Sequence, residues 1–474
     1  MDRKKLALLA AILGSFVAGL DATVVNIALP AIREDLGGGL AGQQWISNAY
    51  LLTLGSLILV GGSLGDLFGE RRIFSLGVAG FGVASLLCAL APSVEVLVLA
   101  RGLQGIFGAL LTPSALAVII AAFPPAERGA AIGSWTAWTG IAFVVGPLAG
   151  GVLVDATSWR WIFLVNVPFV LVTLFVVAKA VQERPRGAAR PHVDIVGAVL
   201  CALGLGGPVY ALTRQPEVGW GSLEVWLPLV AGIALLGAFV AWERRSKDPM
   251  LPLGLFGRRN FAVGNLETIA MYGGLSINLF TAVLFLQQVA DYSALEAGLA
   301  TMPTTIIMFL LSKRMGALAD RLGPRLFMGV GPLIAAAGLL LWLRVGEDAP
   351  YVSGVLPALT IFSLGLSMTV APLTATVLAD ADEHNAGIAS GVNNALARVA
   401  GLLGVAALGI IVSGVITVDS FHRVMAISAG LVAIGGILGL VGIVNPEREV
   451  ECTDCPGGAM VGAPRWVGED RVPA

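Results

Sequence analysis

Long apolar stretches follow one another along almost the whole chain, separated by short polar or glycine-rich segments. A helix that spans a membrane needs about 20 mainly apolar residues. By this measure the pattern predicts fourteen spanning helices, at 7–29, 43–64, 73–91, 95–119, 131–154, 160–181, 194–214, 223–243, 261–289, 296–312, 326–344, 351–378, 390–413 and 421–445. We therefore predict an all-α integral membrane protein.

The composition supports this prediction, because 57% of the 474 residues are hydrophobic and only 13% are charged. The first residues imitate a secretory signal, with basic "DRKK" before apolar "LALLAAILGSFVAGL" and a plausible cleavage site near Ala22. The apolar run continues through "ATVVNIALP", however. We interpret the segment as the first spanning helix.

The basic residues are distributed unevenly between the predicted loops. If successive loops alternate between the two sides, 22 of the 29 Lys and Arg residues fall on the side of both termini. Cytoplasmic loops carry such an excess, so both termini are predicted to be cytoplasmic and the protein to lie in the cell membrane. Since these residues act as topological anchors rather than one patch, we expect the lipid bilayer as a partner and no nucleic acid.

The four cysteines suggest no disulfide framework. Cys452 and Cys455 form a CxxC pair, but neither a second pair nor a histidine lies nearby, so we predict no metal site. No cofactor is predicted either. The segment after Pro446 is rich in glycine, proline and charge and is predicted to be disordered.

The chain repeats itself. "GSLGDLFGER" at 62–71 agrees with "GALADRLGPR" at 316–325 in five of ten positions, at an offset of 254. "RGAAIG" at 128–133 matches "AGIASG" at 386–391 at an offset of 258. Nearly equal offsets at distant places imply two homologous halves.

This repeat predicts the domain organisation. We expect a six-helix bundle in 1–185, two inserted helices with flanking linkers in 186–255, a second six-helix bundle in 256–446 and a cytoplasmic tail in 447–474.

Several motifs resemble those of a known family. "GSLGDLFGERR" and "GALADRLGPR" resemble the loop signature of the major facilitator superfamily, "LARGLQGIFGA" resembles its R-x-x-Q-G signature, and "AFVVGPLAGG" resembles its antiporter signature in the fifth helix. "LDATVVNIALP" and "WRWIFLVNVP" resemble patterns of the fourteen-helix drug:proton antiporter branch. Leu67, Glu70 and Ala142 depart from these signatures.

The resemblance implies the major facilitator fold, in which substrate binds near the midplane between the halves. It also implies a proton-coupled transporter that exports drugs, antibiotics or other amphiphiles by alternating access. We expect it to act on a small molecule and protons, as a monomer.

The two loop motifs suggest a paired gate. Glycines allow a sharp turn between two helix ends, and the acid of each motif lies near arginines with which it can pair. The alternative is a static turn with topological anchors. The residues of this predicted gate are Gly62, Asp66, Gly69, Arg71, Arg72, Gly316, Asp320, Arg321, Gly323 and Arg325.

The antiporter motif consists of Gly146, Pro147, Gly150 and Gly151. Small residues on one face let helix backbones approach closely, so this helix can lie against a helix of the opposite half. Ordinary tight packing is the alternative, since glycine alone does not indicate antiport.

Asp21 lies inside the first predicted span and Arg101 inside the fourth. Intramembrane charges face a bundle interior or a water-filled cavity and are functional by default. A carboxylate held away from water holds its proton more tightly, so we predict that Asp21 carries the coupled proton and pairs with Arg101 in one conformation. A permanent structural pair, or an Asp21 that hydrogen-bonds Thr23 or Asn26, stays open. Glu267 is expected to reach the membrane surface.

The predicted substrate cavity has aromatic and apolar walls that suit planar cations and bulky amphiphiles. Tryptophans near span ends are also common as interfacial anchors, however. Its predicted residues are Asn26, Gln104, Trp135, Trp138, Tyr272, Phe280, Gln287, Asn394 and Arg398.

Rival classes have little support. No G-x-x-x-x-G-K-[ST] phosphate-binding loop occurs. "GGSLG" at 61–65 matches G-x-S-x-G, but it ends an apolar helix without a candidate histidine. We therefore predict no enzyme, and a proton symporter that imports a nutrient or a non-transporting membrane sensor are the remaining alternatives.

Overall fold

A computed structural model describes residues 3–180, 194–247, 249–379, 386–412 and 414–445. This part of the chain is almost entirely helical. Its α-helices are α1 (Arg3–Leu36), α2 (Gly39–Phe68), α3 (Glu70–Ala89), α4 (Val94–Ala122), α5 (Pro125–Ala156), α6 (Trp161–Leu164), α7 (Asn166–Ala180), α8 (Ile195–Val218), α9 (Leu223–Glu243), α10 (Arg259–Gln288), α11 (Ala294–Leu322), α12 (Pro324–Leu341), α13 (Leu356–Ala379), α14 (Ala386–Val412) and α15 (Val418–Gly442). Short helical turns cover Leu253–Gly257, Trp342–Arg344 and Tyr351–Val355.

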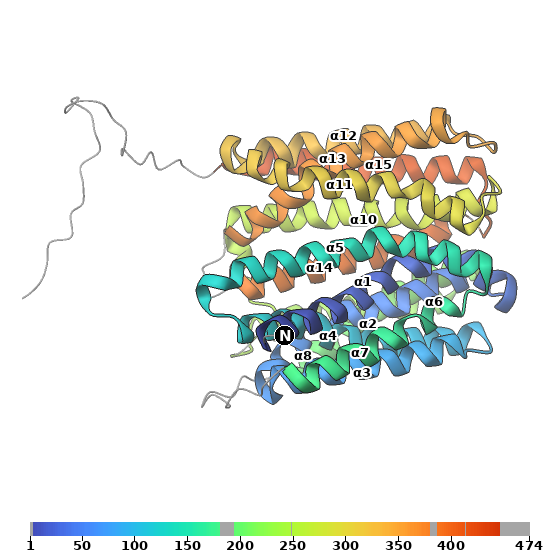
Figure 1. The fold of residues 1–474 in the computed structure, drawn as a ribbon. Coiled ribbons are helices and arrows are strands. Elements are labelled where there is room, and N and C mark those ends of the chain that lie inside the picture. The colour runs from blue at the N-terminus through green and yellow to red at the C-terminus, as the bar shows by residue number, and fades with distance from the viewer. Residues whose placement is uncertain (1–2, 181–193, 248, 380–385, 413, 446–474) are drawn as a thin grey trace, which may run out of the picture. The chain divides into compact units, whose positions relative to one another are not determined.

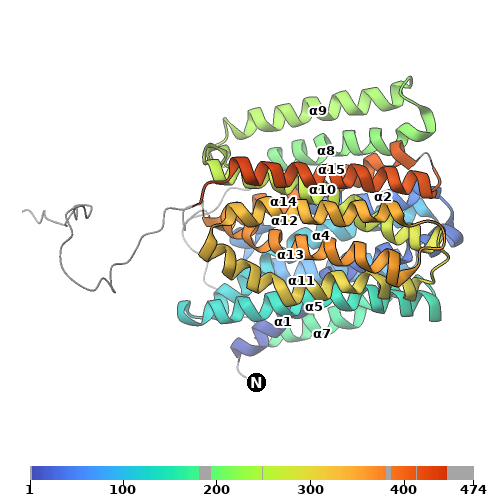
Figure 2. The same cartoon turned by 90° about the horizontal axis from the view of Figure 1, so that it is seen from above.

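The long helices run side by side in both views (Figure 1, Figure 2). Among the described residues, thirteen helices are long and apolar enough to cross a membrane, with α6 and α7 together forming one of them. The predicted span 43–64 lies within α2, a further helix of 30 residues that packs along α4. The predicted all-α membrane fold is confirmed.

Helices α1–α7 pack mainly on one another, as do α10–α15. Helices α8 and α9 pair with each other, and α8 rests on α2 and α14, so α9 lies at the edge of the bundle (Figure 2). The predicted domain boundaries at 185 and 446 fall outside the described residues, as do Cys452 and Cys455.

The sequence repeat has a structural counterpart. Helix α2 ends at Gly69, with φ 99° and ψ 130°, and α11 ends at Gly323, with φ 93° and ψ 143°. Both values lie where residues with a side chain are strained. Glycine at the matching position of both motifs therefore gives the same sharp turn in each half.

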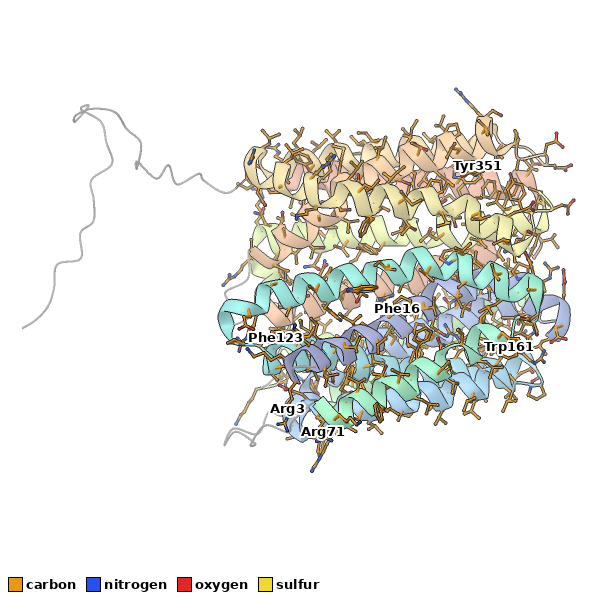
Figure 3. The ribbon with its side chains drawn as sticks, in the orientation of Figure 1. Arg3, Phe16, Arg71, Phe123, Trp161 and Tyr351 are labelled. Atoms are coloured by element: carbon orange, nitrogen blue, oxygen red, sulfur yellow. The ribbon has the colours of Figure 1, made fainter. Side chains whose placement is uncertain are left out.

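The two halves contact each other near one end of the bundle. Arg3, Arg71 and Phe123 lie at one end, here called the terminal end, and Trp161 and Tyr351 lie at the other, here called the loop end (Figure 3). At the loop end Arg33 donates to Gln288 at 3.1 Å. Contacts between the two halves join α1 to α10, α2 to α14 and α5 to α11.

Candidate functional site

Asp21 lies in the middle of α1 and is completely buried. Its Oδ2 accepts a hydrogen bond of 2.6 Å from Nη1 of Arg101, on α4, which is only 2% exposed. The structure thus brings the two predicted charges together as an ion pair inside the first half.

Amide and hydroxyl groups surround this pair. Oδ1 of Asp21 accepts hydrogen bonds from Gln104 at 2.9 Å and from Asn166 at 3.3 Å. Both amides also donate to Ser85, at 2.9 and 3.3 Å. The network joins α1, α3, α4 and α7, and it satisfies both oxygens of the buried carboxylate as a buried charge requires.

Arg101 lies between this network and the central cavity. Its Nε donates to the carbonyl oxygen of Ile46 at 3.2 Å, and its guanidinium lies 4.3 Å from the ring centre of Tyr50. Arg101 and Tyr50 both line the cavity, whereas Asp21 does not belong to its lining. Access from the cavity to Asp21 therefore passes Arg101.

The cavity has a volume of about 380 Å³ and lies between α1, α2 and α4 of the first half and α10 and α14 of the second. Of the predicted cavity residues it includes Asn26, Tyr272, Phe280, Asn394 and Arg398. The described lining contains two charged side chains, Arg101 and Arg398, and no carboxylate.

Four predicted cavity residues lie elsewhere. Gln104 belongs to the network around Asp21. Gln287 donates to the carbonyl of Ile27 at 3.0 Å and so joins α10 to α1. Trp135 donates to Ser15 on α1 and Trp138 is 53% exposed, and neither belongs to the described lining of the cavity.

Sequence reasoning also missed several polar lining residues, among them Thr23, Ser47 and Ser276. A signal existed for Ser276, since it lies four residues after Tyr272 and four before Phe280 and hence on the same helix face.

The antiporter motif contacts both halves. A Cβ added to Gly146 would collide with Oγ1 of Thr23, and one on Gly150 would lie 2.8 Å from Val24, both on α1. On Gly151 it would lie 2.5 Å from Cα of Leu295 on α11, in the opposite half. The predicted close approach between α5 and the second half is present at this glycine.

Asp155 was not singled out from the sequence. It follows Gly151 by one turn of α5, and its carboxylate accepts hydrogen bonds from the backbone N–H groups of Ala294 at 3.2 Å and Leu295 at 2.8 Å. An anion at the first N–H groups of a helix satisfies them and is favoured by the helix dipole. Asp155 therefore fastens α5 to the start of α11.

The predicted gate residues lie at the terminal end. Arg71 donates to the carbonyl of Ala178, and Arg325 donates at 2.5 Å to that of Leu440, near the end of α15. Asp320 and Arg321 are exposed. The side chain of Asp66 lies outside the described part of the structure, so the predicted pairing in the first loop stays a prediction.

The expectation for Glu267 is wrong. Its side chain is completely buried in α10, and neither carboxyl oxygen has a hydrogen-bond partner among the described residues. Gly439 of α15 packs against it, so a Cβ there would lie 3.0 Å from Oε2. The tight contact between the two helices blocks the path by which this side chain would reach the surface.

We expect Glu267→Gln to leave transport intact and to keep or raise the melting temperature of the purified protein. The substitution preserves shape and removes a buried group whose charge has no partner, which is a source of instability. Thermal unfolding of both proteins in the same detergent checks this. A clear fall in melting temperature would instead reveal a partner for the carboxyl group.

A helical bundle with a cavity between two repeated halves and a buried ion pair at its wall defines a class: a membrane transporter. The family model described as Major Facilitator Superfamily matches residues 11–405. The chain belongs to this superfamily.

Known proteins extend this comparison. The chain is 38% identical over 467 residues to the puromycin resistance protein pur8 of Streptomyces alboniger, covering 93% of this chain and 91% of that protein. It is 34% identical to the tetracenomycin C resistance and export protein of Streptomyces glaucescens, covering 86% and 75%. A D-xylose-proton symporter matches in structure with a TM-score of 0.68 at 16% identity, covering 93% and 98%.

Proposed function

We propose that the protein is a proton-coupled exporter of drugs, antibiotics or related amphiphilic small molecules that works by alternating access. It acts in the cell membrane, with both termini in the cytoplasm, as a monomer whose cavity is built from a single chain. The observation that carries the proposal is the ion pair between Asp21 and Arg101, buried directly behind the cavity wall.

The proton is taken up by Oδ2 of Asp21. Oδ1 already accepts from two amides, whereas Oδ2 faces Arg101. Protonation removes the charge that holds the guanidinium and leaves Arg101 only the weaker bonds to Ile46 and Gln104, so that it can turn toward the cavity. The ion pair therefore has two states, closed and open, and both proton binding and substrate binding can shift the equilibrium between them.

The contacts between the halves support an inward-facing state. Gln44 donates to the carbonyl of Val405 at 2.6 Å, and Gln287, Arg33 and Asp155 add the further links described above. These links lie on the loop-end side of the cavity. With cytoplasmic termini, they close the cavity toward the outside.

The names of the relatives favour export, because two of them are resistance proteins and one name includes export. The fold alone does not decide this, since a sugar symporter shares it. A nutrient symporter and a non-transporting sensor are therefore the alternatives that an experiment has to separate.

Everted membrane vesicles acidified by respiration make this separation. For an exporter that exchanges drug for protons, adding a transported drug makes the lumen more alkaline, and a protonophore abolishes this signal. In a separate growth assay, the protein should confer drug resistance on a host that lacks its own exporters, and a protonophore should abolish that resistance. A symporter carries drug and protons in the same direction, so the lumen does not become alkaline. A sensor gives no drug-dependent signal, and that result would overturn the proposal.

A further inference from the structure

The charges around the cavity are unbalanced. Arg398, on α14, lines the cavity and is half-buried, and it makes no hydrogen bond or ion pair with another described residue. Arg101, the other charged lining residue, is already neutralised by Asp21 at 2.6 Å. With no carboxylate in the described lining, the wall carries one uncompensated positive charge before substrate binds.

The neighbours of Arg398 in the lining can hold a flat ring that bears an acidic group. Tyr272 and Phe280 on α10 offer aromatic surface, and Ser276 lies between them on the same face. Asn394 lies one turn before Arg398 on α14, and its amide nitrogen, which donates to the carbonyl of Ser390 at 3.0 Å, has a second N–H for a ligand. A half-buried cation is stabilised by an anion that bonds to it, whereas it repels a cationic substrate.

We propose that the substrate is an aromatic amphiphile with an acidic group, which binds as its anion with that group at Arg398. The inference rests on the proposed transport function and names its substrate class. Export of an anion in exchange for protons has an electrical consequence. The anion that leaves and the proton that enters both make the inside of the cell more positive. An inside-negative potential therefore drives this export, whereas exchange of a monovalent cation for one proton is electroneutral.

Fluorescein and rhodamine 123 provide a matched pair of probes, since they share a xanthene ring and are an anion and a cation, respectively, near pH 7.5. We expect the purified full chain in nanodiscs to bind fluorescein more tightly. Arg398→Gln should weaken fluorescein binding by about 10- to 100-fold, the range of one hydrogen bond to a charged group. Arg398→Gln should bind rhodamine 123 equally well or more tightly, and this binding also shows that the variant is folded. Arg398→Lys keeps the positive charge and should retain most of the preference for fluorescein over rhodamine 123.

A wild-type preference for rhodamine 123, a failure to bind fluorescein, or unchanged fluorescein binding in Arg398→Gln would overturn the inference. Transport in proteoliposomes separates this failure from that of the proposed function. If fluorescein binds through Arg398 but neither dye is transported, the anion site stands and the exporter is wrong. If rhodamine 123 is exported by the proton gradient but fluorescein neither binds through Arg398 nor is transported, the exporter stands and the anion site is wrong.

Discussion

Replacing Asp21 by asparagine is expected to abolish drug transport driven by a proton gradient. Asparagine keeps the size of the side chain and can still accept the bonds from Gln104 and Asn166 through its oxygen, but it cannot take up a proton. Proteoliposomes with an imposed pH gradient measure this directly. Uphill transport should fall to the level of liposomes without protein, whereas Asp21→Glu should retain part of it.

The same substitution should destabilise the protein, which has to be separated from the loss of transport. Removing one partner of a buried ion pair typically costs about 3–5 kcal/mol, because the other charge is left unpaired. We expect the lower end here, since Arg101 lines the cavity and can be hydrated there. The double variant Asp21→Asn/Arg101→Gln removes both charges and should recover most of the stability without recovering transport.

Asp35 provides a matched control on the same helix. It is also paired with an arginine, Arg160, at 2.6 Å, but both side chains are substantially exposed. Exposed pairs contribute only about 0–1 kcal/mol, so Asp35→Asn should change neither transport nor stability by much. Uphill transport that survives in Asp21→Asn would place the coupled proton on another group.

The sequence was sufficient to predict the spanning helices and the pairing of Asp21 with Arg101. Long apolar runs require a membrane, and two opposite charges inside such runs have few other ways to be satisfied. The alternative in which Asp21 bonds Thr23 or Asn26 does not match the structure, where Thr23 donates to backbone carbonyls of its own helix.

The polar shell around that pair could not be predicted in the same way. Ser85 and Asn166 lie in helices far apart in the sequence. Asn166 bonds to Asp21 directly and Ser85 only through Gln104 and Asn166, and both arrangements depend on how each helix is rotated about its axis. Spacing along one helix does not determine this rotation. The same limitation applies to Trp135 and Trp138. Their residue type suits a substrate cavity, but neither belongs to its described lining.

The charge of the cavity could not be predicted from residue types either. The aromatic and apolar walls predict planar cations and bulky amphiphiles, and Arg398 is expected beside Asn393 and Asn394 near the cavity. Only the arrangement of α10 and α14 shows that Arg398 faces the cavity without an acid among the described lining residues. Balance of charge in a cavity is a property of several helices together.

A side chain at Gly151 should shift the protein away from the state seen here. The added Cβ of Gly151→Ala would lie 2.5 Å from Cα of Leu295 and 2.8 Å from the carbonyl oxygen of Ala294, both backbone atoms that cannot turn aside. Overpacking of this kind costs about 1–3 kcal/mol. Because this contact exists only while α5 and α11 touch at the loop end, the cost falls on the closed state.

A destabilisation of this size changes the ratio of closed to open molecules by roughly 5- to 150-fold. Transport should fall accordingly, since a cycle of alternating access needs both states. Spin labels at Glu34 and Glu347, two exposed positions on different halves at the loop end, can report the opening in a protein without its native cysteines. Their distance distribution should move to longer values in Gly151→Ala.

Gly140→Ala is the matched control, because a Cβ at this position of the same helix meets nothing within 4 Å. It makes the same change in composition and helix propensity without touching α11. If the two alanine variants give the same distances and the same transport rates, close approach at Gly151 does not contribute to closure. If only Gly151→Ala changes the distances and the transport rate, close packing at Gly151 contributes to closure of the loop end. Asp155, one turn further along α5, stabilises the same contact through its bonds to the N–H groups of Ala294 and Leu295.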